Sequence, residues 1–414
     1  MMSPKLVGAL LLFPLAWALE DGSEAFYKKA RISHASNTTY NLVTLADAVQ
    51  ELGARCLDGT PAIYYFRKGT GDGINKWYIH HQGGGWCESW DDCLSRSRGA
   101  LGSSKGDAPQ ITMDGGYFSP SPNENPMMYN WNSVYVRYCD GGSFSGSNAT
   151  VASYGGASLY FRGSHNRQAV YNSLVATYQL GNATDVVVSG CSAGGLATYL
   201  HVDQWCDALS VDAPHLNKCV GLPDSGFFLD YESPAVPALV EESTSFTRLT
   251  RKLNTPSGGY HKGLQWAFET FNASSGVNRD CVAAKGIGDD PPYLCMFAEH
   301  TAVFIHTPVF AMQSEYDAWQ TSYVLNPKDG PHAPQQLGDN ITKRMGANMF
   351  GPHPSSGSFL DSCHHHCGSW NSIRIDGDLI STAFAKWYSS LDVKGSKRVW
   401  RQGKPYPCDD CCKP

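Results

Sequence analysis

The amino-acid sequence predicts an α/β fold in which a mostly parallel central sheet is flanked by helices. Short runs rich in β-branched and aromatic residues alternate along the chain with longer stretches of helical periodicity. Strands that alternate with helices usually form a parallel sheet that is covered on both faces. One apolar run also leads through a serine framed by glycines directly into a helical stretch. No internal repeat, low-complexity block or linker divides the chain, so we expect one domain over residues 19–414.

Each predicted element has its own local signal. The segment 186–189 reads Val-Val-Val-Ser, an uninterrupted apolar run of the kind found in strands that are buried on both faces. Two stretches rich in Gly, Ser and Pro, at 139–157 and 326–358, are predicted to be surface loops, and such loops often build active sites. The predicted strands are residues 77–81, 134–138, 186–189, 219–222 and 308–312, and the predicted helices are residues 167–180 and 196–209.

The N-terminus has the pattern of a secretory signal peptide. One basic residue, Lys5, precedes an apolar run from Leu6 to Trp17, and the segment ends on a small-x-small sequence, Ala16-Trp-Ala18. The alternative is a membrane anchor, but an anchor needs a longer apolar run than this one. We therefore expect residues 1–18 to be a signal peptide and the mature protein to be secreted, into the extracellular space or the cell wall.

Composition supports this location and excludes some partners. The chain has fourteen cysteines, and disulfide-rich chains are typical of oxidising compartments. The net charge of −6 is accompanied by no basic run, so we expect neither nucleic acid nor a membrane surface as a partner, and an acidic polymer would need local lysines and arginines. We expect a monomer without a membrane anchor. Five Asn-x-Ser/Thr sites are compatible with glycosylation: Asn37, Asn148, Asn182, Asn272 and Asn340.

The segment Gly190-Cys-Ser-Ala-Gly194 is the strongest chemical signal. An apolar strand runs into G-x-S-x-G and then into a helix, which is the context of a nucleophile elbow in an α/β-hydrolase-like fold. The glycines are needed because the serine lies on a strained turn between the strand and the helix. We predict that Ser192 is a catalytic nucleophile; the alternative is a glycine-rich turn without a chemical role.

A nucleophilic serine needs a base and an orienting acid, which follow it in this fold in the order acid, then histidine. Asp317 is our first choice for the acid and Glu315 our second, because both come just past the end of a predicted strand. The base must then come from His332, His353 or the cluster Cys363-His-His-His-Cys367, and a loop held by disulfides favours the cluster. Zinc is the alternative role of the cluster, but thiols in an oxidising compartment are usually paired, so we expect no metal and no cofactor.

Ester hydrolysis also needs donors for the tetrahedral oxyanion. The segment Gln82-Gly-Gly-Gly-Trp-Cys87 follows a predicted strand, as the glycine-rich oxyanion loop of lipases and esterases does. We predict that the backbone amides of Gly85, Trp86 and Ala193 form the oxyanion hole. Read alone, three glycines are more often a turn, and the pairing with the elbow favours the functional interpretation.

Seven motifs in unbroken order, between about residues 56 and 370, resemble the pectin acetylesterase family, which also includes the Notum carboxylesterases. The resemblance implies an α/β-hydrolase fold with Ser192, Asp317 and His366 as the triad. It selects His366 because the histidine of plant members directly precedes the second cysteine, and it leaves the roles of His364 and His365 open. The motifs are Gly83-Gly-Gly-Trp-Cys87, Arg137-Tyr-Cys-Asp-Gly-Gly-Ser-Phe-Ser-Gly146, Leu159-Tyr-Phe-Arg-Gly163, Gly190-Cys-Ser-Ala-Gly-Gly195, Asp224-Ser-Gly-Phe-Phe228, Tyr316-Asp-Ala-Trp319 and Ser362-Cys-His-His-His-Cys367.

Asp224 also follows a predicted strand and competes with Asp317, but we expect it to make hydrogen bonds near the site. From close spacing and the resemblance, we expect four disulfides that join Cys87 to Cys93, Cys206 to Cys219, Cys281 to Cys295 and Cys56 to Cys139. We expect Cys363 and Cys367 to pair with the tail cysteines Cys408, Cys411 and Cys412, and thereby to tether the histidine loop to the tail. Cys191 is expected to be a free thiol, with a second cysteine left over.

These features predict a secreted serine carboxylesterase that removes acetyl groups from a polysaccharide such as pectin. The Gly-Gly-Gly-Trp-Cys loop is closer to plant and microbial members than to the Notum form, which favours acetyl esters. Two alternatives stay open: a Notum-like enzyme that releases a longer acyl group from a protein, and an inactive secreted carbohydrate-binding protein.

Overall fold

The computed structural model describes residues 38–231, 259–287, 289–408 and 410–412. These residues belong to one compact unit, Ser36–Pro414. The predicted signal peptide, the start of the predicted domain at residue 19 and the sequon at Asn37 lie outside the described residues. None of the described helices is both long enough and apolar enough to cross a membrane.

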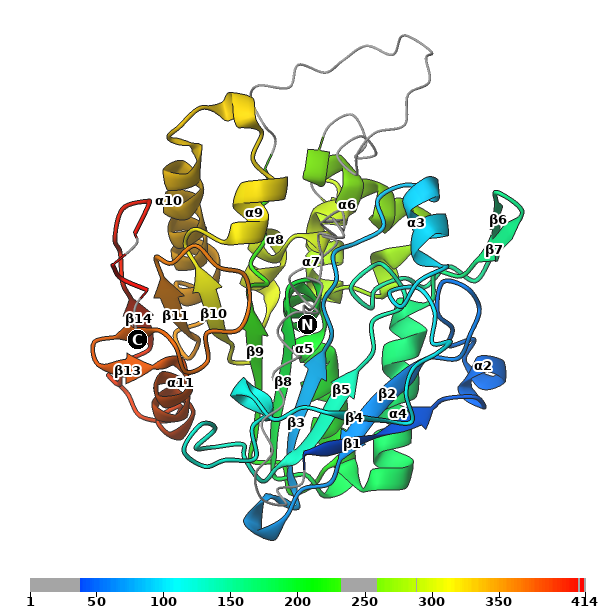
Figure 1. The fold of residues 1–414 in the computed structure, drawn as a ribbon, viewed down its shortest axis with the longest axis horizontal. Coiled ribbons are helices and arrows are strands. Elements are labelled where there is room, and N and C mark those ends of the chain that lie inside the picture. Colours follow the sequence, from blue (N-terminus) through cyan, green and yellow to red (C-terminus); the bar gives the residue numbers. More distant parts are fainter. Residues whose placement is uncertain (1–37, 232–258, 288, 409, 413–414) are drawn as a thin grey trace, which may run out of the picture. The chain divides into compact units, whose positions relative to one another are not determined.

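A ten-stranded sheet forms the centre of the unit, in the order β14-β11-β10-β9-β8-β3-β5-β2-β1-β4 (Figure 1). Neighbours from β14 to β5 are parallel, whereas β2, β1 and β4 add an antiparallel edge. The predicted α/β fold with a mostly parallel sheet is therefore confirmed. The strands of this sheet are β1 Thr39–Thr44, β2 Ile63–Arg67, β3 Lys76–His81, β4 Gln110–Thr112, β5 Asn132–Val136, β8 Asp185–Cys191, β9 Lys218–Asp224, β10 Phe310–Ser314, β11 Gly357–Asp361 and β14 Val399–Arg401.

Two small hairpins and a set of helices complete the unit. The hairpins are β6 Ala152–Tyr154 with β7 Ala157–Leu159, and β12 Arg374–Ile375 with β13 Asp378–Leu379. The α-helices are α2 Ala48–Glu51, α3 Trp90–Arg96, α4 Gly163–Tyr178, α5 Ala193–Asp212, α6 Gly259–Thr270, α7 Arg279–Ile287, α8 Ala298–Thr301, α9 Ala318–Tyr323, α10 Ala333–Met345 and α11 Ile380–Ser389. Shorter turns are η1 Gly71–Gly73, η2 Gly116–Phe118, η3 Leu180–Asn182, η4 Ala273–Ser275, η5 Pro292–Met296, η6 Ala302–Phe304, η7 Pro327–Asp329 and η8 Gly346–Phe350.

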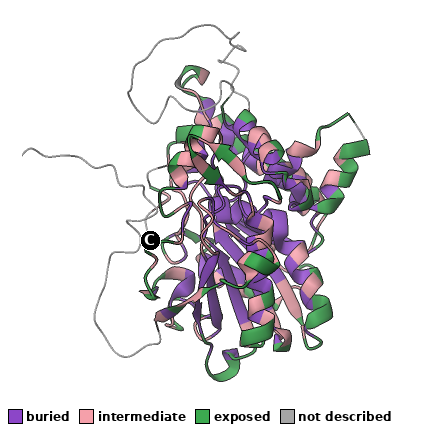
Figure 2. Ribbon diagram, turned by 90° about the vertical axis from the view of Figure 1, so that its right-hand side faces the viewer, coloured by how far each residue is buried: buried purple, intermediate pink, exposed green. Residues whose placement is uncertain are grey.

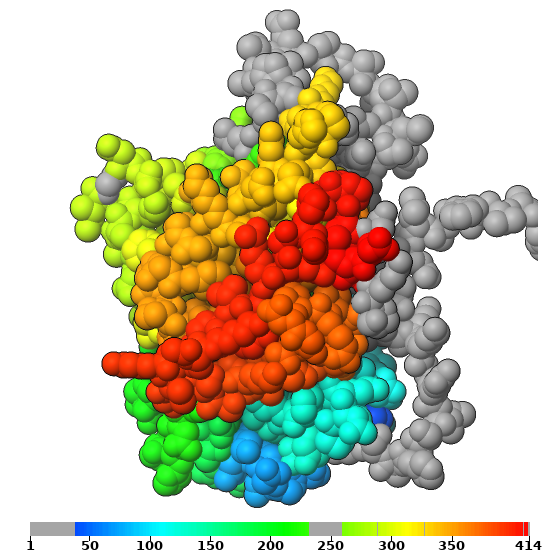
Figure 3. All heavy atoms as spheres, turned by 90° about the vertical axis from the view of Figure 1, so that its left-hand side faces the viewer, coloured from blue at the N-terminus to red at the C-terminus, as the bar shows by residue number. Residues whose placement is uncertain are grey.

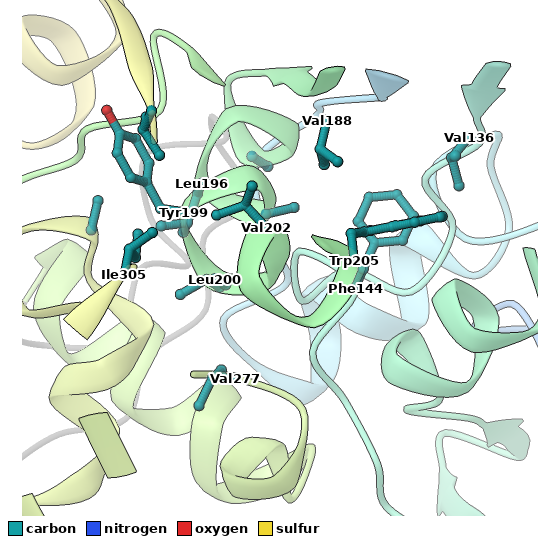
Figure 4. Packing of buried hydrophobic residues seen from close by; sticks show 14 of the residues in the cluster. Val136, Phe144, Val188, Leu196, Tyr199, Leu200, Val202, Trp205, Val277 and Ile305 are labelled. Atoms are coloured by element: carbon teal, nitrogen blue, oxygen red, sulfur yellow. The ribbon is translucent and has the colours of Figure 1, made fainter. Parts of the chain in front are cut away.

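Alternate residues of the buried strands enter two different cores. In β8, Val186 and Val188 belong to the cluster that packs against α4 and α5, whereas Val187 belongs to the cluster that packs against α11. Figure 4 shows α5 side chains such as Leu196 and Trp205 among strand residues such as Val188. The central strands are buried on both faces, whereas β1, β4 and β14 at the edges keep exposed residues, and the surrounding helices expose one side (Figure 2). This burial explains why the predicted strands read as continuous apolar runs.

The two stretches predicted to be surface loops are structured differently. Residues 333–345 form α10, which presents Leu337, Ile341 and Met345 to the core at helical spacing, so the prediction of a loop over 326–358 is wrong there. Residues 139–146 are not exposed either, and Phe144 is completely buried, with its ring centroid 5.0 Å from His81 and 5.3 Å from Tyr138. Gly141, Gly142 and Gly146 are buried in close packing, whereas Gly155 and Gly156 are exposed at the turn of the β6–β7 hairpin.

Candidate active site

Ser192 lies on a sharp turn between β8 and α5. Its φ of 60° and ψ of −124° place it outside the conformations that side-chain-bearing residues prefer. The flanking glycines are required: a Cβ on Gly190 would lie 2.1 Å from the Gly194 carbonyl oxygen, and a Cβ on Gly194 would lie 2.0 Å from the His81 carbonyl oxygen. The G-x-S-x-G pattern therefore follows from close backbone packing. The turn leaves Ser192 8% exposed, beyond the carboxyl end of β8.

The glycine-rich loop after β3 lies directly against this turn. A Cβ on Gly83 would lie 2.9 Å from the Ser192 Cβ, and Gly85 has a φ of +65°. Within the described part of the chain, no acceptor pairs with the amides of Gly85, Trp86 and Ala193. Ala193 opens α5, where the helix dipole also favours negative charge. These amides can therefore receive an oxyanion that forms beside Ser192.

Two residues without a predicted role hold the glycine-rich loop and the elbow together. Ser143 Oγ accepts a hydrogen bond from Trp86 Nε1 at 2.7 Å and donates one to the Ala193 carbonyl at 2.7 Å. The Tyr138 hydroxyl donates to the Gly85 carbonyl at 2.8 Å and accepts from the Ser143 amide at 3.0 Å. Both residues lie in the motif Arg137–Gly146, which resembles the pectin acetylesterase family. No local pattern in the sequence shows that their side chains face the site.

His366 pairs with Asp317, and no hydrogen bond joins either side chain to Ser192 among the described contacts. His366 Nδ1 donates to Asp317 Oδ2 at 2.7 Å, and the other carboxylate oxygen accepts from the Gln320 amide at 2.8 Å. Asp317 is completely buried and caps α9, so its orientation is fixed. His366 Nε2 is buried and has no hydrogen-bond partner among the described residues. The pairing leaves Nε2 as the nitrogen that is able to accept a proton.

The three adjacent histidines have different partners, which the sequence could not show. His364 is exposed and contacts the Thr321 hydroxyl at 2.9 Å, and His365 Nε2 donates to the carboxylate of Asp361 at 3.0 Å. Burial alone would lower the pKa of His365, but Asp361 and the more distant carboxylates of Asp224 and Asp317 raise that pKa to about 9. His365 therefore stays protonated at neutral pH and offsets part of the negative charge around the site.

The two competing carboxylates face other partners. Glu315 accepts hydrogen bonds from Ser362 Oγ at 2.8 Å, from Thr342 and from Arg401. Asp224 accepts from the Gly368 amide at 2.9 Å, and burial raises the pKa of its carboxyl to about 6. Neither makes a hydrogen bond to His366 among the described contacts.

All fourteen cysteines are paired, which corrects part of the predicted connectivity. The four disulfides expected from spacing and resemblance are present. Cys363 pairs with the tail as expected, through Cys412, and Cys408 pairs with Cys411. The predictions of a free Cys191, of a second unpaired cysteine and of a tail partner for Cys367 are wrong, because Cys191 and Cys367 form a disulfide with Cα atoms 5.9 Å apart. The two cysteines are 176 residues apart in the sequence, so their spacing does not indicate that they pair. They meet because the loops after β8 and β11 both leave the sheet at the carboxyl ends of its parallel strands.

The Cys191–Cys367 disulfide joins the residue before Ser192 to the residue after His366. A hydrogen bond also holds the backbone at Cys367, because the Cys367 amide donates to Ser225 Oγ at 2.8 Å. The tail lies against neighbouring segments of the C-terminal part of the chain (Figure 3), with a 2.7 Å hydrogen bond from the Tyr316 hydroxyl to the Lys404 carbonyl. Two tethers, one at each end of the histidine loop, therefore position it.

Four aromatic rings pack together beside His366. Trp86 lies at the centre, with its ring centroid 4.9 Å from Phe228, 5.4 Å from Trp319 and 5.6 Å from Tyr260. Phe228 and Trp319 also lie 6.2 Å and 6.5 Å from the His366 ring. We call these four residues the aromatic wall. It borders the His366 ring on one side.

One cluster away from Ser192 has side chains that a metal ion could use. Ligand atoms of Asp230, Glu299 and His300 lie within 4.8 Å of one another. In the structure Asp230 accepts hydrogen bonds from His300 Nε2 at 3.1 Å and from His261 Nδ1. Burial would raise the pKa of Asp230, but the two imidazoles lower it to about 2. The cluster ties α8 to α6, the helix that carries Tyr260 of the aromatic wall.

Comparison with known proteins fits this geometry. The family model described as Pectinacetylesterase matches residues 33–413. The chain is 31% identical over 394 residues to "Pectin acetylesterase 5" of Arabidopsis thaliana, covering 89% of this chain and 84% of the relative. It is 35% identical over 378 residues to "Palmitoleoyl-protein carboxylesterase notum1a" of Danio rerio, covering 88% of this chain and 69% of the relative. These names describe carboxylic ester hydrolases, and the chain belongs to the pectinacetylesterase family.

Proposed function

We propose that the protein is a secreted serine carboxylesterase that removes acetyl groups from a cell-wall or extracellular polysaccharide such as pectin. The hydrogen bond from His366 to Asp317 is the observation that carries the proposal, because it leaves His366 Nε2 free on a loop that is disulfide-linked to the nucleophile turn. The pectin acetylesterases among the relatives support the substrate class.

The mechanism is a two-step acyl transfer. His366 Nε2 takes the proton of the Ser192 hydroxyl, and the oxygen attacks the acyl carbon. The oxyanion is stabilised by the amides of Gly85, Trp86 and Ala193, and His366 gives its proton to the departing sugar oxygen, which leaves as a hydroxyl. His366 then deprotonates a water molecule that attacks the acetyl carbon, and it returns this proton to Ser192 Oγ as acetate leaves. Asp317 holds the imidazole in the tautomer that this sequence requires and stabilises the imidazolium.

The substrate is tested by measuring acetate released from acetylated pectin, acetylated xylan and chitin under the same conditions. The proposal predicts acetate from at least one acetylated polymer and from a chromogenic acetyl ester. A folded protein that binds these polymers but releases no acetate from any of them would contradict the proposal and favour a carbohydrate-binding role.

Acyl-chain preference is the first prediction. We expect acetate esters to be hydrolysed in strong preference to octanoate esters of the same chromophore, because the aromatic wall fills the space beside His366. Replacing Tyr260 by Ala opens that wall, and the acetate-to-octanoate ratio of kcat/KM should fall roughly tenfold or more, since each accommodated methylene contributes about 1–3 kcal/mol.

Tyr260→Phe is the matched control, since it keeps the ring and removes only a buried hydroxyl that has no hydrogen-bond partner among the described residues. Its ratio should equal that of the parent, and thermal melting of both variants reports any loss of packing. A parent that prefers octanoate would overturn the acetyl assignment and favour a Notum-like function.

The second prediction separates the two tethers of the histidine loop. Replacing Cys191 and Cys367 by Ala should lower kcat roughly hundredfold, the loss expected for about 1 Å of misplacement. Replacing Cys363 and Cys412 by Ala removes the tail tether and should cost less than about tenfold, because the disulfide next to His366 remains. Far-UV circular dichroism and esterase rate are measured together.

The two double variants serve as controls for each other, because both are expected to lose a similar free energy of unfolding. Their disulfides close loops with sequence separations of 176 and 49. Loop-closure entropy then predicts similar losses of unfolding free energy, up to about 5 and about 4 kcal/mol. Equal losses of rate in two folded variants would show that the Cys191–Cys367 disulfide has no special role in positioning His366.

A further inference from the structure

Asp230, Glu299 and His300 form a cluster that takes no part in the proposed chemistry. His300 Nε2 lies 3.1 Å from Asp230 Oδ2 and 3.8 Å from Glu299 Oε1, and the ligand atoms of all three residues lie within 4.8 Å of one another. Ligand atoms bound at about 2.0–2.2 Å to a tetrahedral zinc ion lie roughly 3.3 Å from one another. Small side-chain rotations would therefore bring these three atoms onto one ion.

The kinds of ligand atom in the cluster select the class of metal. Imidazole nitrogen and carboxylate oxygen are both common zinc ligands, and three protein ligands leave a fourth position that water can fill. Ca²⁺ and Mg²⁺ prefer sites made of oxygen atoms alone, so the His300 imidazole disfavours both ions. The cluster therefore fits Zn²⁺ better than either of them.

Other contacts hold each carboxylate so that one oxygen faces His300. Asp230 accepts from His261 Nδ1 with its other oxygen, and His261 Nε2 in turn lies 3.1 Å from the Tyr293 hydroxyl. Glu299 Oε1 is fixed by a 2.8 Å hydrogen bond from the Asp230 amide. Outer partners of this kind orient the ligands of metal sites, and they contribute to metal affinity.

The cluster places two carboxylates close together with little positive charge to balance them. Glu299 is 3% exposed, and apart from the imidazoles the only positive group in ion-pair range of either carboxylate, among the described residues, is that of Arg344. Its Nε lies 3.5 Å from Glu299 Oε2, and the Arg344 side chain is 54% exposed. A divalent cation would supply the missing charge. Asp230 and His300 are 15% and 22% exposed, which leaves an ion access from solvent.

The cluster joins three segments that pack around the aromatic wall. Asp230 comes two residues after Phe228, and its partner His261 follows Tyr260 on α6. The two ligands on α8 come directly after Phe297 and its neighbour, and the Phe297 ring lies 5.6 Å from the Tyr260 ring. An ion bound here would hold the end of β9, α6 and α8 together beside the wall.

We propose that Asp230, Glu299 and His300 bind one zinc ion that has a structural role. Zinc takes the place of the hydrogen between His300 Nε2 and Asp230, and the imidazole keeps its proton on Nδ1. None of the three ligands makes a described contact with the catalytic triad, so the ion stabilises the fold and is not needed for acyl transfer. Sequence spacing does not reveal this site, because Asp230 lies 69 residues before Glu299.

The test uses the full chain without a histidine tag, freed of metal by dialysis against a chelator. Elemental analysis counts the zinc bound per chain after zinc is added back, and calorimetry measures its Kd. We expect one zinc per chain and a melting temperature that rises by roughly 3 °C when zinc is about a hundredfold above its Kd. Mg²⁺ and Ca²⁺ should give no such rise. The kcat for a chromogenic acetyl ester, measured well below the melting temperature, should be the same with and without zinc.

Two variants test the ligands. His300→Gln keeps a hydrogen-bond donor near Asp230 but removes the imidazole nitrogen, and Glu299→Gln removes one of the two negative charges. Each should weaken zinc binding by at least about tenfold, with circular dichroism to confirm the fold. His215→Gln is the matched control, because His215 is exposed and makes no hydrogen bond or ion pair with a described residue. It should bind zinc like the parent.

Two outcomes would overturn the zinc site: a folded parent that binds no zinc, or zinc binding that survives both ligand variants and therefore takes place elsewhere. A loss of kcat on removal of zinc from a still folded protein would contradict the structural role. A parent that binds zinc at this cluster but hydrolyses no acetyl ester would contradict the proposed function and leave the zinc site intact.

Discussion

Replacing Ser192 by Ala should lower kcat on a chromogenic acetyl ester by about a millionfold, the loss known for removal of a nucleophilic serine. The oxyanion amides and His366 remain in this variant, but they cannot replace the oxygen that attacks the acyl carbon. The fold should be unaffected, since Ala tolerates the Ser192 backbone about as well as Ser does. The measurement is the steady-state rate together with the melting temperature.

Ser189→Ala is the matched control. Ser189 is completely buried on β8, three residues before Ser192, and donates a 2.7 Å hydrogen bond to the Leu222 carbonyl. Its loss should cost about 1 kcal/mol of stability and leave the rate within a few-fold of the parent. If Ser192→Ala kept the parental rate, the nucleophile would have to be another group.

Asp317→Asn should lower kcat about ten-thousandfold. The buried Oδ2 atom accepts the Nδ1 proton of His366, so Nε2 carries the lone pair. An amide nitrogen at that position would donate to Nδ1 and force the proton onto Nε2, which could then no longer act as a base. The loss should appear in kcat with little change in KM, because Asp317 contacts no substrate.

Glu315→Gln tests the other carboxylate on the same turn. Glu315 is equally buried, but its hydrogen bonds go to Ser362, Thr342 and Arg401. We expect the melting temperature to fall, because Arg401 loses its ion pair with Glu315. The esterase rate should stay within about tenfold of that of the parent. If Glu315→Gln were the more damaging change for kcat, the assignment of the acid would have to be reversed.

The sequence predicted the sheet because a strand buried on both faces has no polar alternation, as in Val186-Val-Val-Ser. It did not predict α10, because Pro and Gly on either side masked the spacing of Leu337, Ile341 and Met345. The antiparallel edge formed by β1, β2 and β4 was also missed, since its strands are short or lie outside the alternating pattern. Local patterns therefore predicted the buried centre better than the edge.

For the site, the sequence predicted which residues take part but not which other residues they contact. Ser192 is marked by glycines that the backbone requires, and this requirement is local. The disulfide between Cys191 and Cys367 and the Ser143 bridge from Trp86 to Ala193 are not local. They arise only when the loops after β3, β8 and β11 converge at the carboxyl ends of the parallel strands. No spacing rule connects residues that are so far apart in the chain.

The most direct test of the account is to react the protein with a fluorophosphonate, which modifies activated serines, and to map the label by mass spectrometry of its peptides. We expect one label per chain, on the peptide that contains Ser192, with esterase activity lost in proportion to labelling and labelling greatly slowed in Asp317→Asn. Complete labelling at a different residue, or undiminished acetyl-ester hydrolysis by a protein labelled at Ser192, would contradict the central claim that Ser192 is the nucleophile.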